Sequence, residues 1–267
     1  MRRAQQALAR PQVSAEEYDE DYYRSRCAGH EEWAESGGAA EAGIFRAAIE
    51  RSGMLPGMTV CDIGAGRGEL VALAAENGAR WAIGVEYAMP AAMLARETIS
   101  RRDVAGRVVV PLADARRLPL RDASVDRIFM LDVIEHLAPD ELLDTLREAH
   151  RVLRPGGRLF GHTFPTSTIY DVTYRAMRVA WRVTGSSWPA DPRNDYEHRM
   201  HINEQTRTRL RIAMWRAGFR GADVHFGEWL HVEFVPTPKA RAAYAKLARH
   251  RLTAPFAVAD LWVEATR

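Results

Sequence analysis

The sequence predicts an α/β fold built on a doubly wound, mostly parallel sheet. Along residues 58–160, short apolar runs typical of buried parallel strands alternate with segments whose apolar residues have helical spacing. The first of these runs, residues 58–63, passes into the next helical segment through three closely spaced glycines. A length of 267 residues suits one well-packed domain with a cap or insertion.

Composition narrows the class of protein. Hydrophobic residues make up 47% and charged residues 27% of the chain, which is ordinary for a soluble globular protein, and no apolar run approaches the roughly 20 residues of a membrane span. The 37 basic and 35 acidic residues give a net charge of +2, so we expect a small-molecule substrate and no nucleic-acid partner. No signal peptide is recognised, and a cytoplasmic location is expected. The oligomeric state is not predicted.

The turn after the first strand reads D-I-G-A-G-R-G and has the character of a cofactor loop. Gly64, Gly66 and Gly68 permit backbone conformations closed to other residues and allow a ligand to approach the main chain. A dinucleotide fingerprint would place its third glycine where Glu69 stands. Asp62 has the wrong charge to face a pyrophosphate but suits an ammonium group. A tight turn that binds no ligand is the alternative at this point.

This stretch resembles the first motif of the class I S-adenosylmethionine-dependent methyltransferases, an acidic residue followed by G-x-G-x-G. D-V-I-E-H-L at 132–137 and R-P-G-G at 154–157 are similar to later motifs of the small-molecule branch, which includes quinone-pathway enzymes. The resemblance is strong over 58–160 and looser after 200. It implies a Rossmann-like sheet of seven strands with the last one antiparallel, an N-terminal helical cover, and S-adenosyl-L-methionine as cofactor.

The resemblance also implies a set of cofactor-binding residues. Glu86 ends the second strand about 20 residues beyond the glycines, where a doubly wound fold places its ligand for ribose hydroxyls. Tyr87 could pack on the adenine ring, and Asp114 would lie near the adenine amine, unless it is a simple helix cap. The full expected set is Asp62, Gly64, Ala65, Gly66, Gly68, Glu86, Tyr87, Asp114, Ala115 and Asp132.

Two adjacent residues are the catalytic candidates. His136 follows the fourth strand at the carboxyl edge of the sheet, where open α/β folds bind ligands, and could act as a general base. Glu135 could orient His136 or bind an acceptor amine. The alternative is that His136 caps and orients its loop. His162, His198 and His201 lack a fourth ligand and a recognised spacing, so no metal is expected.

The regular alternation of strands and helices ends near residue 160, and this change indicates the domain organisation. Residues 1–39 are expected to form an arm and cover, and residues 40–267 the methyltransferase domain, with a substrate-cap insertion at about 164–203. The helix expected at 169–184 could be a packed cap, could present arginines to an anionic substrate, or could lie on a membrane surface. Aromatic and imidazole side chains from these segments are the substrate-pocket candidates: Tyr22, Tyr23, His162, Tyr170, Tyr174, His198 and His201. Tyr22 and Tyr23 could instead anchor a terminal helix to the core.

Taken together, these features predict methyl transfer to a small-molecule acceptor by in-line displacement. We expect the acceptor atom to be an oxygen rather than a nitrogen or carbon, in specialised metabolism or a quinone-like pathway. The alternatives are an RNA or protein methyltransferase and a cofactor-binding protein without catalytic activity.

Overall fold

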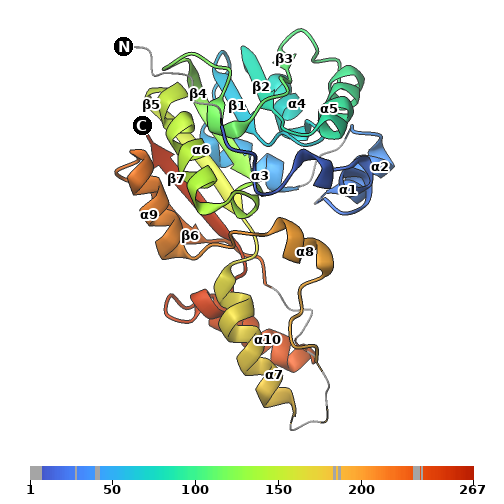
Figure 1. The fold of residues 1–267 in the computed structure, drawn as a ribbon, viewed down its shortest axis with the longest axis vertical. Helices are drawn as coiled ribbons and strands as arrows, with labels where there is room; N and C mark the ends of the chain where they lie inside the picture. The colour runs from blue at the N-terminus through green and yellow to red at the C-terminus, as the bar shows by residue number, and fades with distance from the viewer. Residues whose placement is uncertain are drawn as a thin grey trace.

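The computed structural model describes residues 8–27, 29–39, 43–182, 185, 188–230, 235 and 237–267. Its centre is a seven-stranded sheet in the order β3-β2-β1-β4-β5-β7-β6 (Figure 1). Strand β7 pairs antiparallel with both β5 and β6, and the other pairs are parallel. The predicted mixed sheet is confirmed. The strands are β1 (Thr59–Ile63), β2 (Trp81–Val85), β3 (Val108–Val109), β4 (Val125–Leu131), β5 (Leu153–Thr163), β6 (Asp223–Phe226) and β7 (Leu261–Thr266).

Helices cover both faces of the sheet because its central strands are apolar on both sides. In β4, Ile128 and Met130 pack toward α6 and α9, whereas Phe129 and Leu131 pack toward α3, α4 and α5. These five helices are α3 (Gly43–Ser52), α4 (Glu69–Glu76), α5 (Met89–Arg101), α6 (Pro139–Val152) and α9 (Arg207–Ala217). This two-sided burial accounts for the short apolar runs that alternate with helical segments along residues 58–160.

The N-terminal segment forms a cover at the carboxyl edge of the sheet. It contains α1 (Glu20–Ser25) and α2 (His30–Ser36), and Tyr23 and Trp33 pack against α5. The preceding residues are also docked, because the main-chain N–H of Gln12 donates to Glu141 on α6 over 3.0 Å. The described part of the expected arm therefore lies on the domain.

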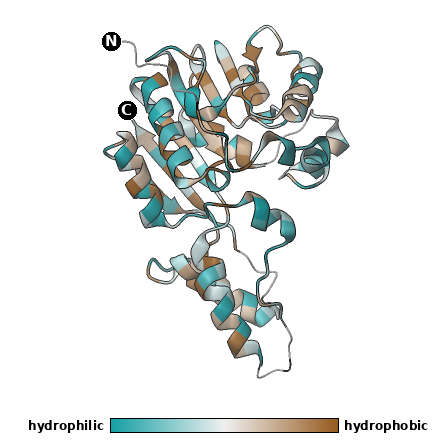
Figure 2. Ribbon diagram, in the orientation of Figure 1, coloured by the Kyte–Doolittle hydropathy of each residue, from teal (hydrophilic) through white to brown (hydrophobic). Residues whose placement is uncertain are grey.

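A separate helical lobe lies beyond the carboxyl edge of the sheet (Figure 1). A π-helical turn at Ile169–Tyr174 leads into α7 (Arg175–Arg182), and α8 (Asp195–Met200) returns toward the sheet. The structure adds α10 (Pro238–Ala248), from between β6 and β7, to the lobe, where Met177 of α7 packs on the cluster around Tyr244. The cap is therefore built from two segments rather than from 164–203 alone. In the described part of the chain, no helix has the length and apolar character to cross a bilayer. Hydropathy is mixed along α7 and α10 (Figure 2).

Candidate functional site

The glycine loop between β1 and α4 adopts a conformation that only glycine accommodates readily. Gly64 and Gly66 have φ values of +78° and +51°. A Cβ atom on Gly64 would lie 2.3 Å from Cγ2 of Val133, so the loop is pressed against the end of β4. Gly64, Ala65 and Gly66 line one large cavity of about 1260 Å³ at the carboxyl edge of the sheet.

Gly68 has a different task from the one expected of it. It lies outside the cavity lining, and a Cβ atom there would come within 2.9 Å of the Cβ of Ala95 on α5. Its φ of +79° also starts α4. The third glycine therefore allows α4 and α5 to approach each other, and its expected contact with the cofactor stays a prediction that this placement does not favour.

The carboxylate of Glu86, which follows β2, holds the glycine loop in place by hydrogen bonds. One oxygen accepts the main-chain N–H of Gly66 over 2.8 Å, and the other accepts those of Tyr87 and Ala88 over 2.7 and 2.9 Å. Burial raises the pKa of Glu86, and these hydrogen bonds oppose that effect. Since a carboxylate has about four lone-pair positions, Glu86 can still accept bonds from ligand hydroxyls.

Asp62 presents a buried carboxylate to the cavity. It is 4% exposed, and among the described residues no hydrogen bond or ion pair holds its side chain. Burial, with the nearby carboxylates of Glu86 and Glu69, raises the pKa of Asp62 to about 8. Such a group is stabilised as an anion by a positively charged ligand.

Tyr87, Asp114 and Ala115 also line the cavity. Asp114 begins a 3-10 turn at Ala115–Arg117 and accepts the main-chain N–H of Arg116 over 2.8 Å. It also forms an ion pair with the Arg116 guanidinium at 2.7 Å. The cap role considered for Asp114 is thus present, and the same carboxylate remains part of the cavity wall.

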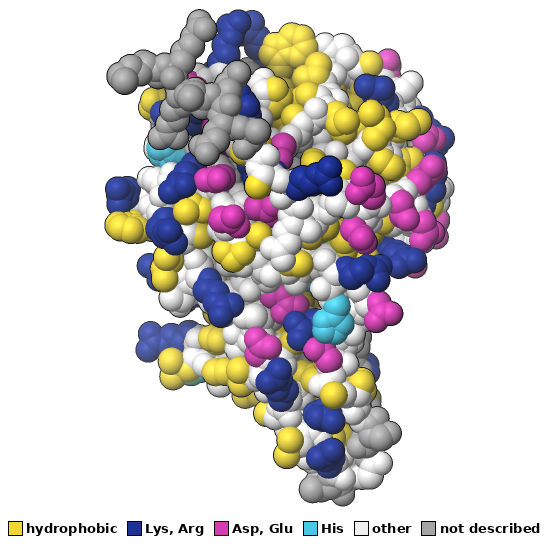
Figure 3. All heavy atoms as spheres, viewed as in Figure 1, with side chains coloured by type: hydrophobic (Ala, Val, Ile, Leu, Met, Phe, Trp, Pro, Cys, Tyr) yellow, Lys and Arg dark blue, Asp and Glu magenta, His cyan; other side chains and the backbone are white. Residues whose placement is uncertain are grey.

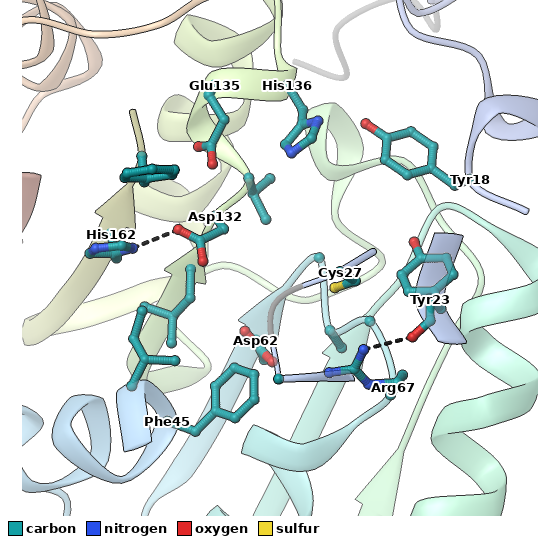
Figure 4. A pocket seen from close by; sticks show the side chains of 18 of the residues that line it. Tyr18, Tyr23, Cys27, Phe45, Asp62, Arg67, Asp132, Glu135, His136 and His162 are labelled. Atoms are coloured by element: carbon teal, nitrogen blue, oxygen red, sulfur yellow. Dashed lines mark hydrogen bonds and ion pairs between the residues drawn. The ribbon is translucent and has the colours of Figure 1, made fainter. Parts of the chain in front are cut away.

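A buried arginine that the sequence did not single out fixes the cover to the loop. Arg67 is 1% exposed and donates from Nη1 to the carbonyl oxygen of Tyr23 over 2.7 Å (Figure 4). Its guanidinium also pairs with Glu69 at 2.9 Å. In the sequence, Arg67 is the variable residue between Gly66 and Gly68 of the glycine motif. Nothing at that position indicates a partner as distant along the chain as Tyr23.

The opposite wall begins with an aspartate at the sharp turn after β4. Asp132 has a φ of +53°, an unusual value for a residue with a side chain, and it faces the cavity (Figure 4). His162 on β5 joins it to Asp260, with nitrogen–oxygen distances of 2.6 and 3.2 Å. Burial opposes a charged imidazole, but the two carboxylates outweigh it and raise the pKa of His162 to about 10. Burial likewise disfavours the Asp132 anion, but His162 lowers the pKa of Asp132 overall.

Glu135 and His136 lie on the next turn, Ile134–His136, and point into the same cavity (Figure 4). Thr163 donates from its hydroxyl to Glu135 over 2.8 Å. Burial, together with the charge of Asp132, raises the pKa of Glu135 to about 8. Burial and the neighbouring His201 lower the pKa of His136 to about 3, so its imidazole is uncharged at neutral pH.

The cover and the cap meet above this wall through tyrosines. The ring of Tyr22 on α1 stacks on Tyr196 of α8, with centroids 5.1 Å apart. Tyr18, which the sequence did not single out, lies with its ring centroid 5.8 Å from that of His136. Tyr23 borders the cavity and is also buried against α5, so it anchors the cover, and its contact with substrate stays a prediction.

Three expected pocket residues lie outside the cavity lining. The hydroxyl of Tyr170 donates to Glu197 over 3.2 Å and that of Tyr174 to the carbonyl of Pro189 over 3.0 Å, so both hold the cap together. The side chain of His198 is 49% exposed and lies 3.8 Å from Asp191. Of the pair on α8 and its end, only His201 lines the cavity. Helical spacing indicated that Tyr170 and Tyr174 are buried but could not distinguish the cavity from the interior of the cap.

Comparisons with known proteins agree with this geometry. Residues 61–161 match the family model described as a methyltransferase domain. The chain is 30% identical over 191 residues to the ubiquinone/menaquinone biosynthesis C-methyltransferase of Azotobacter vinelandii, covering 67% of this chain and 73% of that enzyme. It is 35% identical over 133 residues to the 27-O-demethylrifamycin SV methyltransferase of Amycolatopsis mediterranei, covering 49% of this chain and only 48%, about half, of that enzyme.

Solved structures share the fold. Geranyl diphosphate methyltransferase in complex with its cofactor has a TM-score of 0.59 at 15% identity, covering 91% of this chain and 92% of that chain. The phosphoethanolamine N-methyltransferase 2 of Haemonchus contortus has a TM-score of 0.61 at 15% identity, covering 96% and 57%. These similarities show a common sheet and helix arrangement.

Fold and site together define an open α/β enzyme that binds a nucleoside cofactor at the carboxyl edge of its sheet. The chain belongs to the class I S-adenosylmethionine-dependent methyltransferases. The cofactor of that class is S-adenosyl-L-methionine, as the first motif implied. The residues present fit it: an unpaired buried carboxylate at Asp62 suits its ammonium group, Glu86 suits its ribose hydroxyls, and the glycine loop leaves room for it.

Proposed function

We propose that this methyltransferase methylates an oxygen of a large, partly aromatic small molecule. The observation that carries the proposal is the single cavity that joins the glycine loop to the polar wall of Asp132, Glu135 and His136. Its volume of about 1260 Å³ exceeds that of a typical ligand pocket, roughly 300–1,000 Å³. The cavity therefore has room for a cofactor and a sizeable acceptor together.

The cofactor would be held by the wall nearest β1 and β2. Asp62 would bind the ammonium group, Glu86 the ribose hydroxyls, and Tyr87 with Asp114 and Ala115 the adenine end. S-adenosyl-L-methionine contributes a methyl group on a sulfonium, which a nucleophile attacks in line. The protein's contribution is to orient the two molecules and to exclude water, which can supply on the order of 7–11 kcal/mol in favourable cases.

The acceptor would lie between the polar wall and the aromatic side chains of the cover and cap. Tyr22 and Tyr196 provide stacked rings, and Trp229 and Trp262 line another part of the cavity. The reactive hydroxyl would face Glu135 and His136, and removal of its proton at this wall is worth typically ~10²- to 10⁴-fold in rate. Asp132, fixed by His162, would keep a negative charge near the reaction centre.

The names of the relatives support two kinds of acceptor atom. The name of the rifamycin enzyme indicates methylation at an oxygen, and its match to this chain extends over 133 residues. The longer match, to a quinone-pathway C-methyltransferase, favours methylation of an electron-rich ring carbon as the second candidate.

Methylation assays with a ¹³C-labelled methyl donor separate these candidates. Phenols, naphthoquinols and polycyclic hydroxy compounds would be incubated with the enzyme, and the methyl carbon of each product observed by NMR. A methoxy signal supports O-methylation, and a signal of methyl on ring carbon supports the second candidate. Transfer only to RNA or protein, or no transfer by an enzyme that binds the cofactor, would contradict the proposed function.

A further inference from the structure

Three side chains able to bind a metal ion meet on the acceptor side of the cavity. Glu135 and His136 come from the turn after β4, and His201 follows α8 in the cap. One ligand atom from each residue lies within 4.8 Å of those from the other two. The two imidazole rings meet edge to face, with centroids 5.0 Å apart. We refer to these residues as the Glu135–His136–His201 cluster.

The two histidines of the cluster have unsatisfied ring nitrogens. Nδ1 of His136 and Nδ1 of His201 are buried and have no hydrogen-bond partner among the described residues. His136 is only 8% exposed, so water does not readily compensate it. Buried polar atoms without partners are rare in folded proteins and call for an explanation such as a bound ion. Both nitrogens belong to the same small group, which points to one ligand for the two of them.

The rest of the chain holds the cluster in place. The hydroxyl of Thr163 donates to Oε2 of Glu135 over 2.8 Å. The main-chain N–H of Asn203 donates to the carbonyl of Glu135 over 3.0 Å, and its side-chain amide donates to the carbonyl of Leu137 over 2.8 Å. These bonds fix the segment that carries His201 against the turn that carries His136. Supporting hydrogen bonds of this kind are a regular feature of metal sites.

We propose that Glu135, His136 and His201 bind one divalent transition-metal ion of the Zn²⁺ type. Two imidazoles and one carboxylate form a ligand set that Zn²⁺ and its neighbours accept, and three protein ligands leave a coordination position open for another molecule. Zn²⁺ bonds of about 2.1 Å hold ligand atoms within roughly 4 Å of one another, so the cluster needs only a small closing movement. All three residues line the cavity, so an open coordination position would be accessible from it. On the face drawn in Figure 3, basic and acidic side chains are interspersed.

This inference rests on the proposed function and specifies how the acceptor is activated. An ion in the cluster would bind the acceptor's hydroxyl oxygen and lower its pKa, so that the proton leaves to water and the oxygen becomes a better nucleophile. His136 would then serve as a ligand rather than take the proton itself. The histidines weighed in the sequence as metal-binding partners of His201 were His162 and His198, and neither belongs to the cluster.

The test is titration of the metal-free full-length protein with Co²⁺ and with Zn²⁺. Bound Co²⁺ is followed by its visible absorption and Zn²⁺ by calorimetry, with Mg²⁺ as the ion expected not to compete. We expect one ion per chain. His136→Asn and His201→Asn should weaken binding by more than about 100-fold, since loss of a supporting hydrogen bond alone, as in Thr163→Ala, costs about 10- to 100-fold. His198→Asn is the matched control on α8 and should bind like the wild type.

The outcomes separate the metal site from the proposed function. Absence of a bound ion in the wild type, or equal ion affinity in His201→Asn and His198→Asn, would overturn the metal site. Each variant's thermal unfolding shows whether it is folded, and Thr163→Ala provides the comparison if a histidine variant is not. S-adenosylhomocysteine is titrated into the same metal-free samples. Its binding without metal binding removes the metal site alone, whereas failure of both removes the proposed function.

Discussion

The guanidinium of Arg67 joins the glycine loop to the N-terminal cover through the carbonyl of Tyr23, over 2.7 Å. The same group pairs with Glu69 at the start of α4, and both side chains are almost completely buried, at 1% and 3% exposure. The position of the cover above the cavity therefore depends directly on the cofactor motif. A substitution in the glycine loop should therefore alter the attachment of the cover, and a substitution in the cover should alter the loop.

Arg67→Met is expected to reduce the free energy of unfolding by about 3–5 kcal/mol. The substitution leaves Glu69 buried without its partner, which is the costly way to break such a pair. Urea unfolding measures the loss. Arg24→Met is the control on α1, because the exposed Arg24–Glu20 pair is worth about 1 kcal/mol or less.

The double variant Arg67→Met/Glu69→Leu separates stability from the attachment of the cover. It should recover most of the lost stability because no charge remains buried. Dissociation of S-adenosylhomocysteine should stay faster than in the wild type, since the Tyr23 contact is still missing. Equal loss in the Arg67 and Arg24 single variants would contradict this account of the buried pair.

Cofactor binding should release a proton from Asp62. The pKa of this group is raised from 3.8 to about 8, so in the ligand-free protein the carboxyl is mostly protonated at pH 7. A bound ammonium group favours the anion and drives the proton off. Calorimetry in buffers of different ionisation enthalpy measures the release. Asp62→Asn should bind weakly and release none; equal release by the variant would exclude Asp62 as the source.

The same group predicts how the stability of the ligand-free protein depends on pH. A raised pKa means that the stability associated with the protonated form is fully present below about 3.8 and is lost as pH rises through about 8. Asp62→Asn should remove this decline, so its unfolding free energy relative to wild type should increase from pH 5 to pH 8. A constant difference over that range would contradict the raised pKa.

Gly64→Ala should abolish measurable cofactor binding and destabilise the domain. Its φ of +78° disfavours a side chain, and the new Cβ would collide with Val133. Adding Val133→Ala relieves the collision but not the backbone strain, so recovery should be partial. Gly57→Ala is the control, because its φ is +87° but nothing surrounds it. It should cost about 1–2 kcal/mol and leave binding intact.

His162 should stabilise the fold most below about pH 6.5 and less in alkali. Its pKa is raised from 6.5 to about 10 by Asp132 and Asp260 against the opposing effect of burial. Its contribution is therefore fully present below about pH 6.5 and is lost as pH rises through about 10. Urea unfolding between pH 6 and 10.5 should show this decline. His162→Asn should be less stable at pH 6 and lack this part of the slope; an unchanged slope would assign it to other groups.

Local sequence patterns predicted the sheet and the cofactor side of the cavity because those features are local. Asp62 and the first two glycines occupy one strand-to-helix turn, and Glu86 ends the neighbouring strand, so chain order places them together. Contacts between segments that are distant in the sequence could not be predicted from local patterns. Arg67 with Tyr23, and His136 with His201, depend on how the cover and the cap fold back over the sheet.

The spacing of apolar residues also could not predict which part of the structure a buried side chain contacts. Tyr170 and Tyr174 follow the helical spacing expected of a cap, but both face its interior. Gly68 belongs to the motif by spacing, but the close approach of α5 explains it. Residues 238–248 form α10, and only the packing of Tyr244 with Met177 shows that this helix belongs to the cap.

The central claim is that the cavity at the carboxyl edge of the sheet binds S-adenosyl-L-methionine through Asp62 and the glycine loop. Calorimetric titration of the wild type and Asp62→Asn with S-adenosylhomocysteine, and of the wild type with NAD, tests it most directly. We predict one S-adenosylhomocysteine per wild-type chain, at least tenfold weaker binding by a folded Asp62→Asn variant, on the order of 1.4 kcal/mol, and no binding of NAD. Binding of NAD, or equal affinity of the two proteins for S-adenosylhomocysteine, would contradict the claim.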